Sequence, residues 1–430
     1  VEVGDGVSVK VDGKANAKPE IVRAFIVVPR FRRSYETIWK DFHWDQDHLP
    51  EVHLKSLHFY DNRKENRWFL RMEADARIDR FQYRAIQARD AALTVVLGLP
   101  AEVRLDSIDA RPPTGGRTSG SVVFKLRDAR RCEIRAEGTC EPNQIFSSLV
   151  EGWSETSPVS FAPKMEADVS GTIPLDNPKA LSLSGTAGTP TLNFGPLAFQ
   201  NLAGRWRWKD RCLELEAVEA DLFRGRFSGR GRYCFASASG ELSFDANRVR
   251  LKPLLAEIPG VTVTDQEGVL TVTDADLDVY TQNEDKKLAL EGTAALELAE
   301  SNLWKIPVFS QLANLLNMSL VRRIVGIGDV TELSADLAFR DSTVDIRNFR
   351  TNGTVIALRG IKPGTYNWRT RALHMVVRGE ILKKTVLVPL ITAPISWLFE
   401  AELRGTQQNP EWRLLNAVKK ELFGEEESTE

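Results

Sequence analysis

The feature that most constrains the fold is a run of strict alternation between residues 223 and 235. Every second position from Phe223 to Phe235 is apolar or glycine, while the positions between them carry arginine, serine or cysteine. A period of two is typical of a β-strand with one buried face and one solvated face. Glycines on the apolar face would let another group approach the sheet closely. The run therefore predicts a strand.

The segment just before this run alternates in the same way. Leu213 and Leu215 fall on one side of residues 211–218, and glutamates fall on the other. A hairpin that turns near Phe223 would set these glutamates opposite the arginines, which modestly favours strand pairing. The same register brings Cys212 close to Cys234 on the polar face, which suggests a disulfide bond. Two unpaired cysteines are the alternative interpretation.

Length and composition limit the class of protein. A chain of 430 residues is long for one compact core, so several modules or an extended architecture are expected. The 57 basic and 59 acidic residues nearly cancel, so bulk charge gives no attraction to nucleic acid, and we expect no nucleic-acid partner. The four cysteines are too few for a disulfide scaffold, and their spacing matches no zinc pattern.

Alternating segments recur along most of the chain. A meander of strands followed by a short helix is expected around residues 65–99, 190–258 and 268–325. We therefore predict a mainly β chain with a few short helices: an elongated, curved antiparallel β-sheet groove built of repeated strand-meander plus helix modules. Short helices are expected near residues 84–97, 143–150, 252–258 and 302–325.

Three regions are expected. Residues 1–164 form an N-terminal β-rich segment with a helical insertion at about 30–60 and a helix at about 84–97. Residues 165–415 form a β-groove region, and residues 416–430 form a polar tail.

The chain offers little that would support catalysis or metal binding. Its histidines at 43, 48, 53 and 58 recur every fifth residue, whereas metal ligands on one helix or one strand recur at three to four or at two residues. The sequence contains no metalloprotease motif, nucleophile elbow or phosphate loop. We expect no enzyme activity, no cofactor and no metal site, and the role of His43, His48, His53 and His58 stays open.

The termini and the longest apolar run bear on membrane attachment. The chain starts at Val1, within what looks like a strand pattern, so we interpret it as part of a longer protein. The apolar run Thr385–Phe399 contains two prolines and is shorter than the roughly 20 residues that a spanning helix needs. Any membrane anchor is expected outside these residues.

Three stretches carry a family resemblance. The first is Leu213–Gly231, which ends in Leu-Phe-Arg-Gly-Arg-Phe-Ser-Gly-Arg-Gly. The second is the strand Gly292–Leu298 leading into Leu303-Trp-Lys-Ile-Pro-Val-Phe. The third is the closing Leu403-Arg-Gly-Thr-Gln-Gln-Asn-Pro-Glu-Trp-Arg. Over residues 165–415 the chain resembles the C-terminal region of the AsmA-like family of bacterial envelope proteins, which includes TamB-type members. The motifs are loose patterns of glycine and apolar alternation, without a catalytic group.

The resemblance implies a function and a location. It implies a protein held to the inner membrane by an N-terminal helix and projecting into the periplasm, with possible envelope protein partners. It further implies a β-groove of the bridge-like lipid transfer kind, whose apolar face shields the acyl chains of phospholipid or another lipid between the inner and outer membranes. The chain departs from the pattern by lacking the anchor and by its histidine-bearing insertion.

The candidate lining of such a groove is a set of large apolar residues from alternating segments: Trp206, Trp208, Leu213, Leu215, Phe223, Phe227, Tyr233, Leu288, Leu290, Leu296 and Leu298. Burying an acyl chain against them would yield about 0.8 kcal/mol per methylene. The alternative is a filled β core, which would make the chain a structural or adhesive envelope scaffold. The two readings differ in one respect, which is whether protein covers the apolar face.

Overall fold

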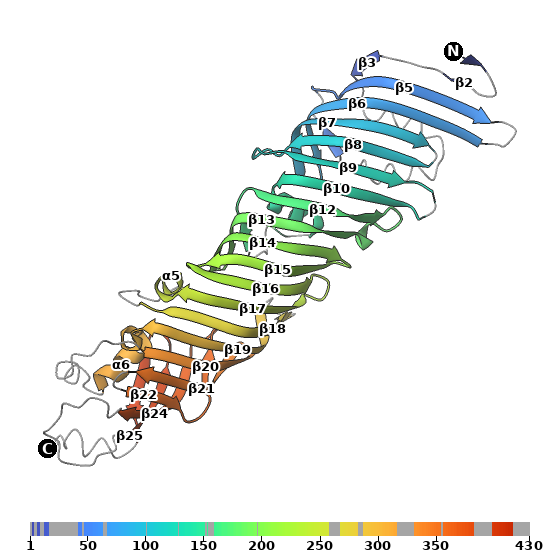
Figure 1. Ribbon diagram of the computed structural model, residues 1–430. Helices are drawn as coiled ribbons and strands as arrows, with labels where there is room; N and C mark the ends of the chain where they lie inside the picture. Colours follow the sequence, from blue (N-terminus) through green and yellow to red (C-terminus); the bar gives the residue numbers. More distant parts are fainter. Residues whose placement is uncertain are drawn as a thin grey trace, which may run out of the picture. The chain divides into compact units, whose positions relative to one another are not determined.

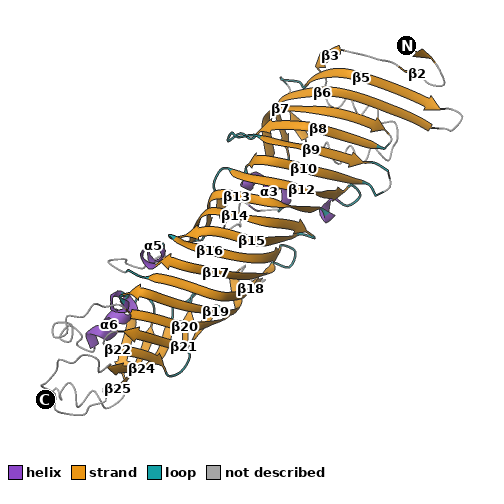
Figure 2. Ribbon diagram, in the orientation of Figure 1, coloured by secondary structure: helices purple, strands orange, loops and turns teal. Residues whose placement is uncertain are grey.

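The computed structural model describes residues 2–3, 7–8, 13–16, 42–44, 47–62, 67–99, 101–127, 129–150, 153, 159–195, 197–257, 267–282, 287–315, 331–353, 356–381 and 398–415. The described chain is mainly antiparallel β-sheet, and its helices are few and short (Figures 1 and 2). The expectation of a mainly β chain with a few short helices is therefore confirmed.

The chain forms two compact units. Unit 1 comprises Val1–Gly195, Gln200–Glu216 and Cys234–Ala236, and unit 2 comprises Pro196–Phe199, Ala217–Tyr233 and Ser237–Glu430. Strands β14 to β16 contribute residues to both.

The N-terminal elements of unit 1 are all strands. They are β1 (Glu2–Val3), β2 (Val7–Ser8), β3 (Gly13–Asn16), β4 (Phe42–Trp44), β5 (Glu51–Asn62), β6 (Arg67–Tyr83), β7 (Ile86–Leu99), β8 (Glu102–Arg111) and β9 (Thr118–Lys125). From β5 to β9 each strand pairs with the next in antiparallel fashion, and Figure 1 shows β5 to β9 side by side in that order.

A short helix interrupts the order of strands in unit 1. The elements here are β10 (Arg131–Cys140), α3 (Pro142–Leu149), β11 (Val159–Phe161), β12 (Met165–Pro174), the 3-10 helix η1 (Pro178–Ala180), β13 (Ser182–Phe194), β14 (Leu197–Lys209), β15 (Cys212–Leu222) and β16 (Gly225–Cys234). β10 pairs directly with β12, although α3 and β11 lie between them in the sequence. The sheet therefore runs through the boundary that was expected between residues 164 and 165.

The described strand pairings within unit 2 are also antiparallel. Its elements are β17 (Ser239–Arg250), α5 (Leu251–Ala256), β18 (Val269–Gln282), β19 (Lys287–Ser301), η2 (Leu303–Lys305), α6 (Pro307–Leu315), β20 (Thr331–Asp341), β21 (Thr343–Gly353), β22 (Ile356–Gly360), β23 (Gly364–Asn367), β24 (Leu373–Ile381), β25 (Leu398–Gly405) and β26 (Pro410–Leu414). The helices expected near 143–150, 252–258 and 302–325 correspond to α3, α5 and η2–α6, and residues 316–325 lie outside the described part.

Two helical expectations were wrong. The segment 84–97 is strand β7, not a helix. In the insertion expected at 30–60, residues 42–44 and 51–62 are strands β4 and β5, and residues 30–41 lie outside the described residues. His43, His53 and His58 lie on these strands.

Beta-bulges interrupt many strands at a non-glycine residue. At each bulge one residue adopts a left-handed conformation, which shifts the side-chain alternation by one and bends the strand. Asp90 of β7 and Ser107 of β8 sit at register shifts in unit 1, and Arg248, Asp274 and Glu300 do so in unit 2. Partner strands supply acceptors for the displaced amides, since Asp245 Oδ1 accepts the backbone N–H of Asp274 over 2.9 Å.

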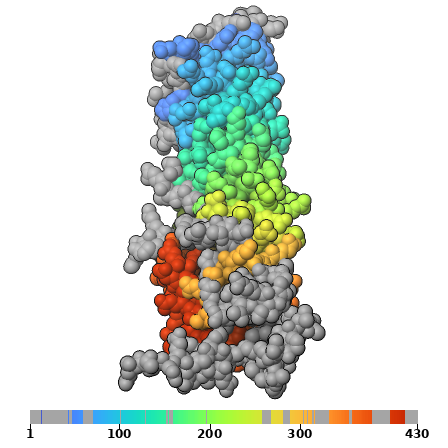
Figure 3. Space-filling model, turned by 90° about the vertical axis from the view of Figure 1, so that its left-hand side faces the viewer, coloured from blue at the N-terminus to red at the C-terminus, as the bar shows by residue number. Residues whose placement is uncertain are grey.

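Unit 2 contains a filled core between its helix α6 and its last strands. The side chains of Leu312, Leu358 and Val377 are fully buried there. Around them pack Trp304, Phe309, Ala335, Phe349, Met375, Phe399, Ala401 and Leu403. In the space-filling view the orange and red residues of unit 2 adjoin one another (Figure 3). Part of the apolar face is therefore covered by this chain's own helix.

Candidate functional site: the apolar face of unit 1

Two rows of apolar side chains cross the sheet of unit 1 on one face. Strand register places the members of each row directly opposite one another on neighbouring strands. The first row is Val95, Leu105, Val122, Ile134, Gly171 and Leu183, and the second is Leu97, Val103, Phe124, Cys132 and Ile173. We call these the apolar rows. They contain no charged side chain.

The apolar rows are only partly shielded from solvent. Cys132 is buried, whereas the valine, leucine, isoleucine and phenylalanine members all keep part of their surface exposed. The buried apolar residues in the described part of unit 1 are mostly small: Ala74, Ala76, Ala91, Ala110, Cys132, Trp208 and Cys212. A packed core normally buries large aliphatic side chains completely, as α6 does in unit 2.

Ion pairs lie on the polar face of several strands in unit 1, including strands outside the apolar rows. Arg207 of β14 lies 3.4 Å from Glu214 and 3.5 Å from Glu216 of β15. Arg117 donates two hydrogen bonds to Asp109, and this arginine holds the pKa of the Asp109 carboxyl below its usual range. These exposed pairs separate the two faces chemically.

Two polar side chains of unit 1 donate hydrogen bonds to backbone carbonyls within the protein. Trp206 donates its indole N–H to the backbone carbonyl of Thr186 over 3.3 Å. Thr118 donates its hydroxyl to the carbonyl of Thr139 over 2.5 Å. Burial raises the pKa of the Cys132 thiol to about 12 and that of Cys140, on the same strand, to about 11. This face thus offers hydrocarbon surface and protonated thiols.

The predicted lining residues from β14 to β16 are placed unevenly. Leu215 is 38% exposed, and Trp206, Leu213, Phe227 and Tyr233 are partly exposed. Trp208 is buried and stacks on Phe235 at 5.4 Å. Phe223 lies in the tight turn between β15 and β16 with φ 46°.

Phe227 belongs to a group of three aromatic rings in unit 2. Its ring lies 5.1 Å from that of Phe199 and 5.5 Å from that of Phe244. Among the predicted lining residues of β19, Leu290 and Leu296 are partly buried and Leu298 is buried, while the side chain of Leu288 lies outside the described set. Sequence reasoning thus named two residues, Trp208 and Leu298, that the protein itself covers.

The apolar rows of β7 to β13 were missed by sequence reasoning. The alternation Val103-Arg-Leu105 and Ile134-Arg-Ala136 is visible in the sequence, but the bulges at Asp90 and Ser107 break its regularity. Reading the apolar alternation separately on each side of a bulge would have identified the rows.

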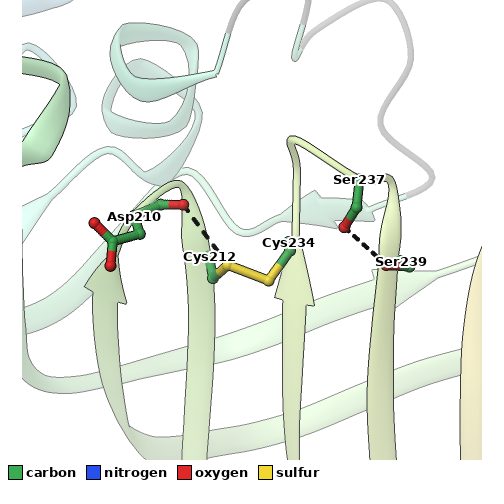
Figure 4. Close-up of a disulfide and its surroundings, with 5 residues drawn as sticks. All are labelled: Asp210, Cys212, Cys234, Ser237 and Ser239. Atoms are coloured by element: carbon green, nitrogen blue, oxygen red, sulfur yellow. Dashed lines mark hydrogen bonds between the residues drawn. A yellow bond between two sulfur atoms is a disulfide. The ribbon is translucent and has the colours of Figure 1, made fainter.

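Cys212 and Cys234 form a disulfide bond between β15 and β16 (Figure 4). This is the pairing that the strand register suggests. Both cysteines share the alternation of the polar face, with Glu214 and Arg232 as their neighbours two positions along. Cys132 and Cys140 are free thiols.

The described residues contain no group of three or more His, Cys, Asp or Glu side chains that could hold a metal ion. None of the described helices is both long enough and apolar enough to cross a membrane. No protein-family model, curated protein or solved structure matches this chain.

Proposed function

We propose that this chain is a non-enzymatic lipid-handling module that carries acyl chains along its apolar face. The observation that supports the proposal most is the incomplete burial of the apolar rows in unit 1, in contrast to the fully buried cluster under α6. Large hydrocarbon surfaces left partly in water typically mark a binding surface.

Hydrocarbon fits the chemistry of the rows better than a sugar does. The rows carry no charge, and the hydroxyl of Thr118, on the same face of β9 as Val122, already donates to a backbone carbonyl. A glycan would need unoccupied polar partners, whereas a methylene chain gains about 0.8 kcal/mol for each group it buries.

The resemblance to AsmA-like envelope proteins supports a location for this activity. On that basis we propose a module of the periplasm, anchored to the inner membrane by a segment outside these residues, that moves phospholipid or another acyl lipid between the inner and outer membranes. The disulfide is compatible with an oxidising compartment.

A structural or adhesive envelope scaffold with a filled β core is the second candidate. The buried cluster of unit 2 is what this reading predicts, because Leu312, Leu358 and Val377 are inaccessible to any ligand. The two candidate functions predict different effects on lipid loading and on folding when a charge is placed on each face of the unit 1 sheet.

The decisive comparison uses two neighbouring valines of β9. Val122 belongs to the apolar rows, and Val123 lies on the opposite face between Arg104 and Glu133. Val122→Glu should reduce the loading of a fluorescent long-chain fatty acid at least tenfold while far-UV circular dichroism stays native. Val123→Glu should leave both unchanged. Native mass spectrometry of the purified chain should show bound lipid, which Val122→Glu removes.

Two results would contradict the proposal. If Val122→Glu unfolds the protein, the face is a packed core and the scaffold candidate stands. If the folded variant loads fatty acid as well as the original chain does, the rows are not the binding surface.

A further inference from the structure

The short connections at one edge of unit 1 carry an excess of basic residues. Successive antiparallel strands alternate in direction, so every second connection falls on the same edge. Backbone hydrogen bonds tie these connections to one another: Leu126 donates to Ala101, and Leu175 donates to Arg130. We call this the turn edge, formed by the connections β7–β8, β9–β10, β12–β13 and β14–β15.

The cations of the turn edge are exposed and unpaired. Arg127 lies between β9 and β10, Lys179 between β12 and β13, and Lys209 and Arg211 at the turn between β14 and β15. None of the four makes an ion pair or a side-chain hydrogen bond within the described residues. Arg130 is different, because its guanidinium binds Asp176 over 2.7 Å.

Acidic residues do not cancel this charge. Asp176 is already paired, and Asp210 stands between Lys209 and Arg211 in the turn. Basic residues outnumber acidic ones in these connections even when Asp128, outside the described residues, is counted.

The opposite edge of unit 1 is arranged differently. There Arg117 binds Asp109 over 2.6 Å, and Arg111 lies 3.8 Å from Asp90. Lys164 is an exposed cation of that edge without an ion pair in the described part of the chain, and the exposed Arg84 in the β6–β7 turn donates a hydrogen bond to the carbonyl of Ser148 over 3.5 Å. Among the described connections at the two edges of unit 1, most of the exposed cations without an ion pair thus lie on the turn edge.

The spacing of the cations suits a row of headgroups. Neighbouring strands lie about 4.8 Å apart, so connections two strands apart are separated by roughly 10 Å. This is close to the Debye length of about 8 Å at physiological ionic strength, so the fields of adjacent cations overlap into a continuous positive rim. The rim borders the strand ends of β9, β10, β12 and β13, which carry the apolar rows.

We propose that Arg127, Lys179, Lys209 and Arg211 form a headgroup rail that selects anionic, phosphate-bearing lipids over zwitterionic ones. The acyl chain lies on the apolar rows while the phosphate follows the turn edge. This inference rests on the proposed function, and it assigns the choice of lipid to residues away from the apolar face.

The test compares two fluorescent lipids with identical acyl chains, phosphatidylglycerol and phosphatidylcholine, and an uncharged diacylglycerol. Each is offered to the 430-residue chain in vesicles. A headgroup that meets one or two cations at a time should give phosphatidylglycerol a preference of about five- to thirtyfold. Raising the salt to about 0.5 M should remove most of this preference, because screening is then much shorter in range.

The variant replaces Arg127, Lys179, Lys209 and Arg211 with glutamine. It should lose the preference while loading diacylglycerol as before, and Lys164→Gln should keep the preference. Because all four side chains are exposed and unbonded, the variant should keep its native circular dichroism. Equal loading of both phospholipids by the original chain would overturn the rail. Failure to load any of the three lipids would overturn the proposed function itself.

Three further outcomes would give these four cations a different role and would overturn the headgroup rail. Saturable binding of inorganic phosphate in equilibrium dialysis, lost in the fourfold variant, would indicate a site for a free anion. Oligonucleotide binding that disappears in the variant would indicate a nucleic-acid surface. Weaker sedimentation with anionic vesicles at unchanged loading per bound protein would indicate membrane docking only.

Discussion

The indole Nε1 of Trp412 in β26 donates a hydrogen bond to the backbone carbonyl oxygen of Val308 in α6, over 2.6 Å. The phenyl ring of the next helical residue, Phe309, lies 6.2 Å from the same indole. These contacts join the helix to the last described strand, more than a hundred residues further along the chain. They hold α6 against the apolar face of unit 2.

Replacing this indole should loosen α6. Trp412→Phe keeps an aromatic ring but removes the donor, so it should lower the free energy of unfolding of unit 2 by about 1 kcal/mol. Urea denaturation followed by near-UV circular dichroism measures the change. Trp206→Phe is the matched control: its indole donates a longer, solvent-exposed hydrogen bond of 3.3 Å to Thr186, so losing it should lower the free energy of unfolding by less. An unchanged midpoint for Trp412→Phe would mean that the hydrogen bond does not hold the helix.

Leucine truncation should distinguish the covered face from the uncovered one. Leu312→Ala removes a fully buried side chain and leaves a cavity, so it should cost about 2–5 kcal/mol. Leu105→Ala, in the apolar rows, should cost about 1 kcal/mol or less because its side chain is already partly solvated. Equal losses in denaturant titrations would contradict the difference in burial.

The local alternation in the sequence was sufficient to predict a mainly β chain, and the helix expected at 84–97 shows where it misled. Before the bulge at Asp90 the apolar residues of β7 are Ile86 and Ala88, and after it they resume at Ala91 and Leu93. The bulge adds one residue, so apolar positions three apart resemble one turn of a helix. Only pairing with β6 and β8 reveals the strand.

The candidate site was harder to predict than the fold. Leu298 and Leu296 look equivalent in the alternation of β19, yet Leu298 is buried and Leu296 is partly exposed. The difference depends on which segment packs over each residue. Elsewhere in unit 2, the packing of α6 depends on Trp412, a contact too distant in sequence for any periodicity to reveal.

Thiol reactivity should follow the disulfide and the burial of β10. In denaturant without reductant the chain should show two reactive thiols, Cys132 and Cys140, and reductant should release Cys212 and Cys234 as well.

In the folded protein both free thiols should react slowly at pH 8. Burial raises the pKa of Cys132 to about 12 and that of Cys140 to about 11, so little thiolate is present until the pH rises toward these values. Alkylation rates measured by mass spectrometry between pH 7 and pH 10 should increase with pH, with Cys140 ahead of Cys132. Rates equal to those of the unfolded chain would show that β10 is open to solvent on both faces.

The left-handed backbone conformation of Ala217 predicts that glycine is favoured at this position. Ala217 sits in the middle of β15 with φ 49°, where an alanine side chain crowds its own backbone. Glycine adopts this conformation freely, so Ala217→Gly should raise the free energy of unfolding by about 0.5–1 kcal/mol. Ala220→Gly, three residues along the same strand, should lower it by about 1 kcal/mol, because Ala220 is buried and not among the positive-φ residues. Thermal unfolding of the two variants measures both signs. Destabilisation by both would mean that Ala217 is an ordinary strand residue without backbone strain.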